Sequence, residues 1–482
     1  MPVNTVSTDT KPLVVDLDGT LLKSDMLLET GFAFLRKRPL RFYQPLLWLL
    51  RGGKAHLKAN LAEHVFVEVA NLPFNQAVLE WLREEKAQGR SLILATATHR
   101  SYAEQIGAHL GLFDQVLATD RTINLSAERK RDALVAVFGE EGFDYVGNSR
   151  EDLVVWEAAD AAIVVDPELG VARRAEAVAN SVKLIETRNG SAKAWLKQLR
   201  VHQWLKNLLI FVPLVAAHQV RSLPLLLNTT LAFFFFSLCA SSVYLLNDLL
   251  DLNEDRSHPR KRFRPFAAGT LSLKSGIIAF PILLLTAFVG SFVLLPPMFS
   301  AGLALYYALT LGYSLILKRV VIIDVVTLAA LYTIRIIAGS FATGLALTFW
   351  LLAFSMFMFL SLALVKRFAE LRMARAKGGD EKISGRGYYP SDLEMLSSMG
   401  AASGYLSVMV LALYIQDSST SHLYSHPKFI WLACPLLLFW ISRTWMLTHR
   451  GHMHDDPVVF AVKDRISLLT GALMLLAFWL AV

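Results

Sequence analysis

The sequence contains very little cysteine and comparatively little charge. Only 2 of its 482 residues are cysteines, and both Cys239 and Cys434 lie inside apolar runs, far apart along the chain. This pattern excludes a disulfide framework and a CxxC metal site, so we interpret both thiols as packing residues. Charged residues make up 18% of the chain and hydrophobic residues 54%, a balance that indicates insertion into a membrane.

The first residues also lack the pattern of a secretion signal. The stretch MPVNTVSTDTKP has no basic segment followed by an apolar one. We therefore expect no cleavable signal peptide, and we expect the N-terminal part to stay in the cytoplasm.

Hydrophobic residues are concentrated in the later part of the chain. Residues 1–190 have an ordinary density of charge, whereas apolar runs of about 20 residues, long enough to cross a bilayer, begin near Trp204. We expect a soluble α/β domain over residues 1–190 and an all-α polytopic bundle of transmembrane helices over residues 191–482. About nine spans are predicted, at residues 204–221, 227–249, 276–297, 299–317, 322–342, 346–365, 399–416, 428–446 and 466–482.

The distribution of basic residues predicts the orientation of these spans. With residues 1–190 in the cytoplasm, the cytoplasmic loops hold most of the lysine and arginine of the bundle, and the opposite loops hold only Arg221 and Lys428. This asymmetry follows the positive-inside rule. We therefore predict a multi-pass protein of a bacterial-type cytoplasmic (inner) membrane, with its motif-bearing loops facing the cytoplasm. The net charge of +8 is explained by this topology, and no nucleic-acid partner is expected.

An acidic segment follows the second predicted span. It reads Asn247-Asp248-Leu249-Leu250-Asp251-Leu252-Asn253-Glu254-Asp255, so Asp248, Asp251 and Asp255 would share one face of a helix. Three carboxylates on one face repel each other unless a cation joins them. Oxygen ligands suit Mg²⁺, which completes its shell with water and substrate phosphates. The segment predicts a magnesium site for a diphosphate.

Basic residues follow the acids directly. Arg256, Lys261, Arg262 and Arg264 stand within a few residues of Asp255. Cations next to a metal site favour phosphate binding. The alternative is a juxtamembrane basic cluster that contacts anionic lipid, with acids that merely offset its charge.

The whole run from Asn247 to Gly269 fits NDxxDxxxDRxHPxKxxRPxAxG and resembles the UbiA superfamily of membrane prenyltransferases, in the branch that includes decaprenyl-phosphate phosphoribosyltransferases. The resemblance extends over about residues 195–482. One departure concerns the second DxxxD motif of enzymes with aromatic acceptors, which is replaced here by Lys366-Arg367-Phe368-Ala369-Glu370. It makes a second metal cluster doubtful and favours a substrate with several separate phosphates.

The resemblance implies a reaction and a set of site residues. The diphosphate of 5-phosphoribosyl diphosphate would bind one or two Mg²⁺ ions held by Asp248, Asp251 and Asp255, while a polyprenyl phosphate attacks the ribose C1. The implied catalytic residues are Asp248 and Asp251. The implied substrate-binding residues are Lys206, Asn207, Asn247, Arg256, His258, Lys261, Arg262, Arg264, Lys318, Arg335, Lys366, Arg367 and Glu370. Because Arg335 lies within a span, we expect it to pair with a substrate phosphate or with Asp324.

A second pair of carboxylates lies near the N-terminus. The apolar run Leu13-Val14-Val15 predicts a strand that leads into Asp16-Leu17-Asp18-Gly19-Thr20. Residues two apart on a strand point the same way. One carboxylate can then attack phosphorus while the other acts as acid and base near Mg²⁺.

Three later motifs make residues 1–190 similar to the haloacid dehalogenase (HAD) superfamily. Thr96 ends the buried run Ser91–Ala95, Lys130 follows at the expected distance, and Asp152 closes the segment Tyr145-Val146-Gly147-Asn148-Ser149-Arg150-Glu151-Asp152. The resemblance implies a doubly wound parallel sheet with a helical cap over about residues 25–80. It implies four catalytic residues: Asp16 as nucleophile, Asp18 as acid and base, and Thr96 and Lys130 to hold the phosphate and neutralise its charge. It also implies one Mg²⁺ held by Asp16, Asp18 and Asp152. Asn148 replaces an acid of the family motif, which puts metal affinity and phosphatase activity in doubt.

The cap contains the apolar run from Arg41 to Arg51, which is too short to span a membrane. This run could lie at a membrane interface, cover the active site, or pack inside the cap.

We interpret the chain as a transferase that makes a polyprenyl-phosphoryl 5-phosphoribose, fused to a phosphatase that removes the 5-phosphate. The alternative is a prenyltransferase that passes a prenyl group from prenyl diphosphate to an aromatic acceptor, with a regulatory N-terminal domain. The oligomeric state and the length of the polyprenyl chain are left open.

Overall fold

The computed structural model describes residues 11–187, 191–376, 386–417, 424–453 and 456–482. The chain forms two compact units, Met1–Leu199 with Tyr244–Ala279, and Arg200–Val243 with Phe280–Val482. The acidic segment thus belongs to the same unit as the N-terminal domain, which the expected boundary at residue 190 did not anticipate. Below, the head denotes the described residues up to 187, and the membrane body denotes the second unit.

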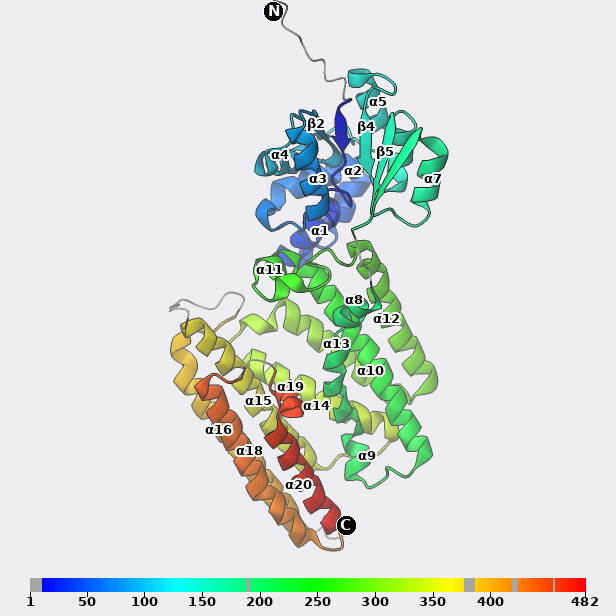
Figure 1. Cartoon of the computed structure of the whole chain (residues 1–482). Coiled ribbons are helices and arrows are strands. Elements are labelled where there is room, and N and C mark those ends of the chain that lie inside the picture. Colours follow the sequence, from blue (N-terminus) through cyan, green and yellow to red (C-terminus); the bar gives the residue numbers. More distant parts are fainter. Residues whose placement is uncertain (1–10, 188–190, 377–385, 418–423, 454–455) are drawn as a thin grey trace, which may run out of the picture. The chain divides into compact units, whose positions relative to one another are not determined.

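The head is built on a six-stranded parallel sheet in the order β3-β2-β1-β4-β5-β6 (Figure 1). The strands are β1 Leu13–Val15, β2 Leu92–His99, β3 Gln115–Thr119, β4 Asp144–Gly147, β5 Ala161–Val165 and β6 Ser181–Ile185. Val14 pairs with Ile93 on one side and with Tyr145 on the other, so β1 is central. The doubly wound parallel sheet is confirmed.

Alternating residues of the strands form two separate cores. Leu13 and Val15 face a cluster that includes α3 (Gln76–Ala87) and α4 (Arg100–Leu110). Val14 faces the opposite cluster, with α5 (Glu128–Phe138), α6 (Leu153–Trp156) and α7 (Val171–Val178). This two-residue period explains why the strands read as continuous apolar runs, since both faces of the sheet are buried.

The predicted cap is helical. Its first helix, α1 (Met26–Lys37), begins at Asp25, whose carboxylate accepts hydrogen bonds from the amides of Leu27 and Leu28 at 2.9 and 3.2 Å. The second helix, α2 (Gln44–His64), is broken at Gly52 and Gly53, and Gly53 has a φ of +68°. The break divides α2 into two parts with different surroundings.

Seven helical segments of the described chain are long and apolar enough to cross a membrane. They are α10 (Leu223–Leu250), α12 (Leu273–Leu294), α13 (Pro297–Leu315), α14 (Ile323–Thr343), α15 (Phe349–Arg375), Pro390–Gln416 with α16 (Leu393–Gln416), and Pro427–Arg450 with α18 (Ala433–Arg450). The protein is therefore an integral multi-pass membrane protein.

The expected count of nine spans is not confirmed. The first expected span is a 3₁₀ helix, Val201–Phe211, followed by the short helix α9 (Val212–Ala216). The last is α20 (Arg465–Ala481), whose 17 residues rise only about 26 Å against about 30 Å of hydrocarbon. Both segments are apolar but shorter than the seven spans.

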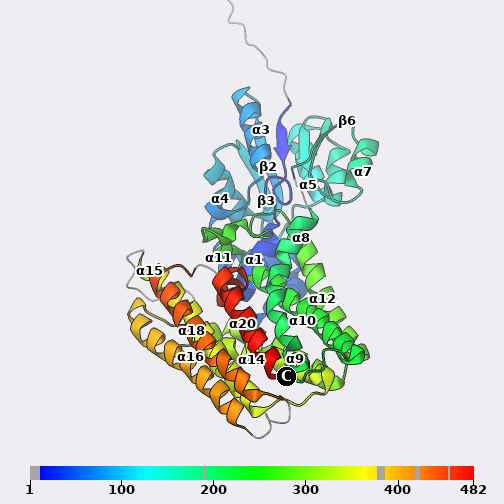
Figure 2. The same ribbon diagram turned by 60° about the horizontal axis from the view of Figure 1, so that its bottom comes forward.

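Within the membrane body, α15, α16 and α18 run side by side (Figure 2). Phe359 of α15, Val408 of α16 and Ile441 of α18 belong to one buried cluster. The 3₁₀ segment packs against α14 at Gly339, where an added Cβ would overlap the carbonyl group of Ile210. This close approach holds the segment that carries Lys206 and Asn207.

Candidate functional site

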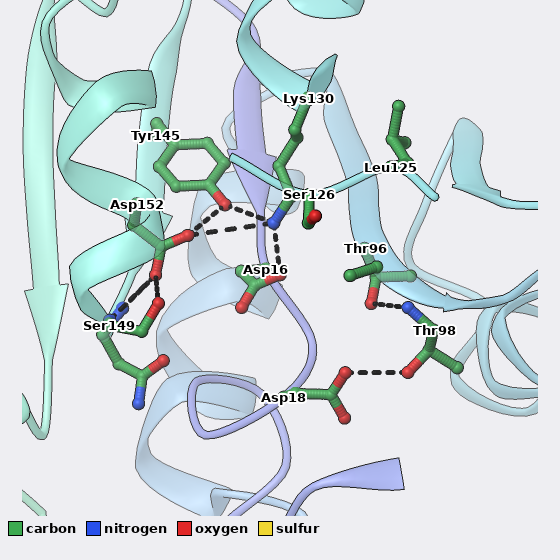
Figure 3. A network of polar contacts seen from close by, with 12 residues as sticks. Asp16, Asp18, Thr96, Thr98, Leu125, Ser126, Lys130, Tyr145, Ser149 and Asp152 are labelled. Atoms are coloured by element: carbon green, nitrogen blue, oxygen red, sulfur yellow. Dashed lines mark hydrogen bonds and ion pairs between the residues drawn. The ribbon is translucent and has the colours of Figure 1, made fainter. Parts of the chain in front are cut away.

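The two predicted carboxylates of the head lie at the carboxyl end of β1, where open α/β sheets bind their ligands. The Lys130 ammonium donates a hydrogen bond to Asp16 Oδ1 at 2.7 Å and another to the Tyr145 hydroxyl at 2.8 Å (Figure 3). Both Lys130 and Asp16 are buried. The structure thus brings the predicted residues Asp16 and Lys130 together, across β1 and the start of α5.

Asp152 is held by a dense set of donors. Its Oδ2 accepts from the amides of Asn148 and Ser149 at 3.0 and 2.8 Å, and its Oδ1 accepts from the Tyr145 hydroxyl at 2.8 Å. Lys130 Nζ lies 3.8 Å from Asp152 Oδ1. The sequence pattern did not single out Tyr145, which joins Lys130 to Asp152.

Asn148, the departure from the family motif, points a buried side-chain oxygen at no hydrogen-bond donor among the described residues. Its neighbours Asp16 and Asp18 supply carboxylate oxygens in the same cavity. An unpartnered amide oxygen next to two carboxylates is a donor set that fits a hard cation such as Mg²⁺. The structure thus supports a metal role for Asn148 itself.

Two threonines of β2 approach the carboxylates. Thr98 donates its hydroxyl to Asp18 Oδ2 at 2.7 Å, and the Thr98 amide donates to Thr96 Oγ1 at 3.0 Å. Thr98 lines the cavity, whereas the predicted Thr96 is fully buried behind it. The hydroxyl of Thr98 was missed because the motif was matched at the first threonine of Ala95-Thr96-Ala97-Thr98.

The cap contributes Lys58 to the same cavity. Its ammonium donates to the Ala97 carbonyl at 2.6 Å and to Asn124 Oδ1 at 2.8 Å. Burial lowers the pKa of Lys58, and the charges of Asp18 and Asp25 oppose that change. Sequence reasoning missed Lys58 because an isolated lysine in an amphipathic helix carries no motif.

Burial also changes the pKa values of the carboxylates. It raises the pKa of Asp16 to about 7, with Asp152 and Asp18 adding to the effect and Lys130 opposing it. It raises the pKa of Asp18 to about 6, with Asp25 adding to the effect. A bound cation would lower both pKa values again, because it stabilises the charged form of each carboxylate.

The carboxylates open into a cavity of about 810 Å³ within the first unit. Cations line it, among them Lys23, Lys54, Lys58 and Lys274. Lys274 stands at the start of α12 and pairs with Glu168 at 2.9 Å. A polar cavity of this size, lined by both carboxylates and lysines, suits a phosphorylated substrate larger than inorganic phosphate.

The acidic segment does not form one continuous helix. Helix α10 ends at Leu250, Asp251 has φ −96° and ψ 14°, and α11 covers Leu252–Ser257. Arg264 Nη1 donates to Asp248 Oδ1 at 3.0 Å and to Asp255 Oδ2 at 2.6 Å, so these two acids share one cation. Asp251 instead lies 2.9 Å from Nε of Arg36 in α1.

Further contacts surround these acids. Gln198, at the end of α8 (Ala192–Gln198), donates to Asp248 Oδ2 at 2.8 Å. Burial raises the pKa of Asp255 to about 6, against the opposing charge of Arg264. The oxygen-only donor set fits Mg²⁺, which needs only one or two carboxylates because water and phosphate supply the rest. Among the described residues, however, no group of three or more His, Cys, Asp and Glu side chains is gathered as metal ligands, so the magnesium site at these acids stays a prediction.

The predicted basic residues after the acids take different places. Arg256 is buried and donates to both carboxylate oxygens of Glu29 at 2.8 and 2.6 Å. His258 Nδ1 accepts from the Lys261 amide at 3.3 Å, and Arg262 lies over the Phe263 ring at 4.9 Å. Of this set, the structure brings Arg264 to the acids, whereas Arg256 is occupied by Glu29.

A separate cluster of predicted residues lies inside the membrane body. Lys206 and Lys366 place their ammonium groups 2.7 and 3.3 Å from Asp456 Oδ2, and the Tyr332 hydroxyl lies 3.2 Å from Oδ1. Burial acts to raise the pKa of Asp456, but the charges of Lys366 and Lys206 hold it well below its usual range. Asp456 was missed because it stands 250 residues from Lys206, where it caps the short helix α19 (Pro457–Lys463).

Arg335 is placed next to this cluster by α14. Its Nε donates to Asn207 Oδ1 at 2.9 Å, and its guanidinium lies 5.6 Å from the centre of the Tyr332 ring. The expected pairing with Asp324 is wrong, because Asp324 forms a buried ion pair with Arg367 at 2.6 Å.

Arg367 also contacts Glu370, one turn further along α15. The lone carboxylate that replaces the second DxxxD motif is therefore tied to a neighbouring guanidinium. Asn247 is half-buried near the end of α10, and Lys318 lies in the 3₁₀ turn Leu317–Arg319. Their predicted roles, like those of the other substrate-binding residues, stay predictions.

A family model described as the UbiA prenyltransferase family matches residues 208–471, more than half of the chain. The chain belongs to the UbiA prenyltransferase family. A second model, haloacid dehalogenase-like hydrolase, matches residues 13–153. The protein is thus a UbiA-family membrane domain with an N-terminal HAD-like domain, and both families consist typically of Mg²⁺-dependent enzymes.

One relative matches nearly the whole chain, and another matches just over half of it. The UbiA-family chain is 39% identical over 472 residues to the uncharacterized protein y4nM of Sinorhizobium fredii, covering 98% of this chain and 91% of the relative. It is 30% identical over 276 residues to the decaprenyl-phosphate phosphoribosyltransferase of Mycobacterium tuberculosis, covering 56% of this chain and 88% of the relative. A UbiA homologue from Archaeoglobus fulgidus, solved with DMAPP and Mg²⁺, has a TM-score of 0.46 and 15% identity, covering 60% of this chain and 99% of that one.

Proposed function

We propose that this protein transfers phosphoribose from 5-phosphoribosyl diphosphate to a polyprenyl phosphate and then removes the 5-phosphate with its head. The observation that carries the proposal is the similarity of more than half of the chain to a decaprenyl-phosphate phosphoribosyltransferase. The single Glu370 in place of a second DxxxD motif, itself paired with Arg367, supports the same substrate class. Each half of the proposal concerns one of the two domains.

In the transfer step, an oxygen of the lipid phosphate attacks C1 of the ribose, and the bond from C1 to the diphosphate oxygen breaks. Asp248, Asp251 and Asp255 would hold Mg²⁺, which neutralises charge on the diphosphate. Arg264, already shared by Asp248 and Asp255, is the cation best placed to accompany the diphosphate. No protein nucleophile is required.

Inside the membrane body, Lys206 and Lys366 both contact one carboxylate, Asp456, and the guanidinium of Arg335 lies close by, over the Tyr332 ring. This excess of positive charge in an apolar bundle suits a phosphate anion. We propose that the cluster binds a phosphate group of one of the substrates. Asn207 then orients Arg335 by accepting its hydrogen bond, and Tyr332 orients Asp456 by donating one to its carboxylate.

In the hydrolysis step, Asp16 attacks phosphorus and the ribose 5-oxygen leaves. Asp18 donates the proton that the leaving oxygen needs, and it later accepts a proton from the water that cleaves the aspartyl phosphate. Lys130 offsets the negative charge of Asp16, and Thr98 fixes the orientation of Asp18 through its hydroxyl. Asp16, Asp18 and Asp152 would hold the Mg²⁺ ion of this site, together with the amide oxygen of Asn148.

We further propose that both activities face the cytoplasm of a bacterial-type inner membrane, as the basic loops indicate. Fusion of the two domains would keep the phosphorylated lipid at a local concentration of about millimolar near the head.

Mass spectrometry of lipids tests the proposal. Purified protein receives a polyprenyl phosphate, 5-phosphoribosyl diphosphate and Mg²⁺, and we expect polyprenyl-phosphoryl ribose as product. Asp16→Asn should accumulate the 5-phosphorylated lipid, and Asp248→Asn should give neither lipid. Asp132→Asn, the same change at an exposed carboxylate of α5, serves as the control and should behave as the parent protein. Transfer of a prenyl group from prenyl diphosphate to an aromatic acceptor instead would refute the proposal.

A further inference from the structure

The cap presents a strip of large apolar side chains to the outside. Leu40, Phe42, Leu46 and Leu50 are 84%, 70%, 59% and 73% exposed. Tyr43 and Leu47 are exposed as well. Contiguous exposure of this kind marks a surface that binds a partner or a membrane.

The outward direction of the strip is fixed by packing on its other side. Trp48 turns inward, with its ring 5.1 Å from that of Phe34 and 5.3 Å from that of His64. Beyond the break at Gly52 and Gly53, Leu57 and Leu61 of the same helix are buried in the core of the head. The two parts of α2 therefore differ in role. The part after Gly53 packs into the core of the head, and the part before Gly52 presents its apolar side chains to the outside.

The charges around the strip have one sign. Lys37, Arg38, Arg41, Arg51 and Lys54 flank it, and the sequence holds no Asp or Glu from residue 30 to residue 62. Apolar side chains with a basic border are typical of segments that lie in the interface of an anionic bilayer. Anionic lipids attract such cations over about a Debye length.

The cap also contacts the segment that leaves the membrane. Glu29 of α1 binds Arg256, and Arg36 of α1 lies 2.9 Å from Asp251, the residue directly after the span α10. These contacts lie within the first unit. They put the cap within reach of the bilayer surface, which favours lipid over a second copy of the chain as the occupant of the strip.

We propose that residues 40–51 of the cap dock into the interfacial region of an anionic bilayer. The docked part is joined through Gly52 and Gly53 to the part of α2 that carries Lys58 into the phosphatase cavity. Docking therefore holds that cavity at the bilayer surface, where a lipid-borne phosphomonoester is found. The proposal concerns binding alone and holds whether or not the head is an active phosphatase.

Fluorescence quenching of the full-length protein tests the proposal. In a Cys239→Ala, Cys434→Ala background, Phe42→Cys or Leu50→Cys is labelled with an environment-sensitive dye and reconstituted into phosphatidylethanolamine and phosphatidylglycerol vesicles. Val137→Cys, an exposed apolar position of α5 outside the strip, is the matched control. We expect brominated lipids to quench both cap labels at least about twofold more than the control.

A second experiment tests whether the basic residues beside the strip contribute to docking. Arg41→Gln combined with Arg51→Gln should reduce the quenching of the label at Leu50→Cys in anionic vesicles, and pure phosphatidylcholine should have the same effect. Quenching equal to that at Val137→Cys would overturn the proposal. A label that is shielded from aqueous quenchers but not reached by brominated lipids would overturn it in favour of contact with a second copy.

Discussion

Glu29 and Arg256 form a two-pronged ion pair in which the side chains are 0% and 3% exposed. Arg256 also donates to the Ala267 carbonyl at 3.0 Å, so its guanidinium is bound on two sides. Removing one partner of a buried pair leaves an unpaired charge, which costs about 3–5 kcal/mol. The pair therefore makes the fold of the segment after α10 depend on a residue of the cap.

Glu29→Gln should lower the stability of the first unit by about 3 kcal/mol, because Arg256 loses its counter-charge. Thermal unfolding of the full-length protein, followed by intrinsic fluorescence, measures the change. Asp160→Asn breaks the exposed pair with Lys11 and should cost less than about 1 kcal/mol. Equal losses of stability in the two variants would show that the buried pair stabilises the protein no more than the exposed pair does.

Asn148→Asp should lower the Mg²⁺ concentration needed for phosphatase activity by about tenfold, because a carboxylate replaces a neutral amide in the donor set. Asn148→Ala should raise that requirement. Titration of Mg²⁺ against hydrolysis of a generic phosphomonoester by the full-length protein checks both changes. If Asn148→Ala leaves the Mg²⁺ requirement unchanged, Asn148 has no part in metal binding.

Asp456→Asn should reduce lipid transfer by about 100-fold or more, since Lys206 and Lys366 would lose the carboxylate that holds them together. Asp464→Asn is the matched control. Asp464 pairs with Arg443 at 2.7 Å and caps α20, so its loss should cost about 1 kcal/mol of stability and little transfer. Similar loss of transfer in both variants would argue against a specific role for Asp456.

The stability of the head should depend on pH through Asp16. Burial raises the pKa of Asp16 from 3.8 to about 7, so between these values the folded head binds a proton that the unfolded chain releases. The contribution of this group to stability is therefore lost as the pH rises from about 4 to about 7. In chelator, the melting temperature should fall over this range more steeply for the parent protein than for Asp16→Asn. Added Mg²⁺ should reduce the slope, and identical slopes in both proteins would exclude Asp16 as the source.

Local patterns in the sequence predicted the parallel sheet, the cap and the placing of Asp16 and Lys130 in one site. They were sufficient there because each motif follows a strand whose neighbours in the sheet bring the carboxyl ends together. The contacts of Glu29 with Arg256 and of Lys206 with Asp456 join residues more than 200 positions apart. Without side-chain packing, no local signal selects such partners.

The ends of helices were harder to predict for a related reason. Apolar composition marks a membrane segment but does not distinguish an α-helix from the 3₁₀ helix found at Val201–Phe211. Likewise, carboxylate spacing predicted a shared face for three acids, but the chain turns at Asp251 and directs it to Arg36.

The arrangement of the cation cluster in the membrane body depends on Gly339. The backbone of Ile210 occupies the space that a side chain at this position would need, and the 3₁₀ turn that ends there also carries Lys206 and Asn207. A single methyl group on α14 would push that turn outward and separate Lys206 from Asp456 and Asn207 from Arg335. The spacing of these polar groups thus depends on a residue that has no side chain of its own.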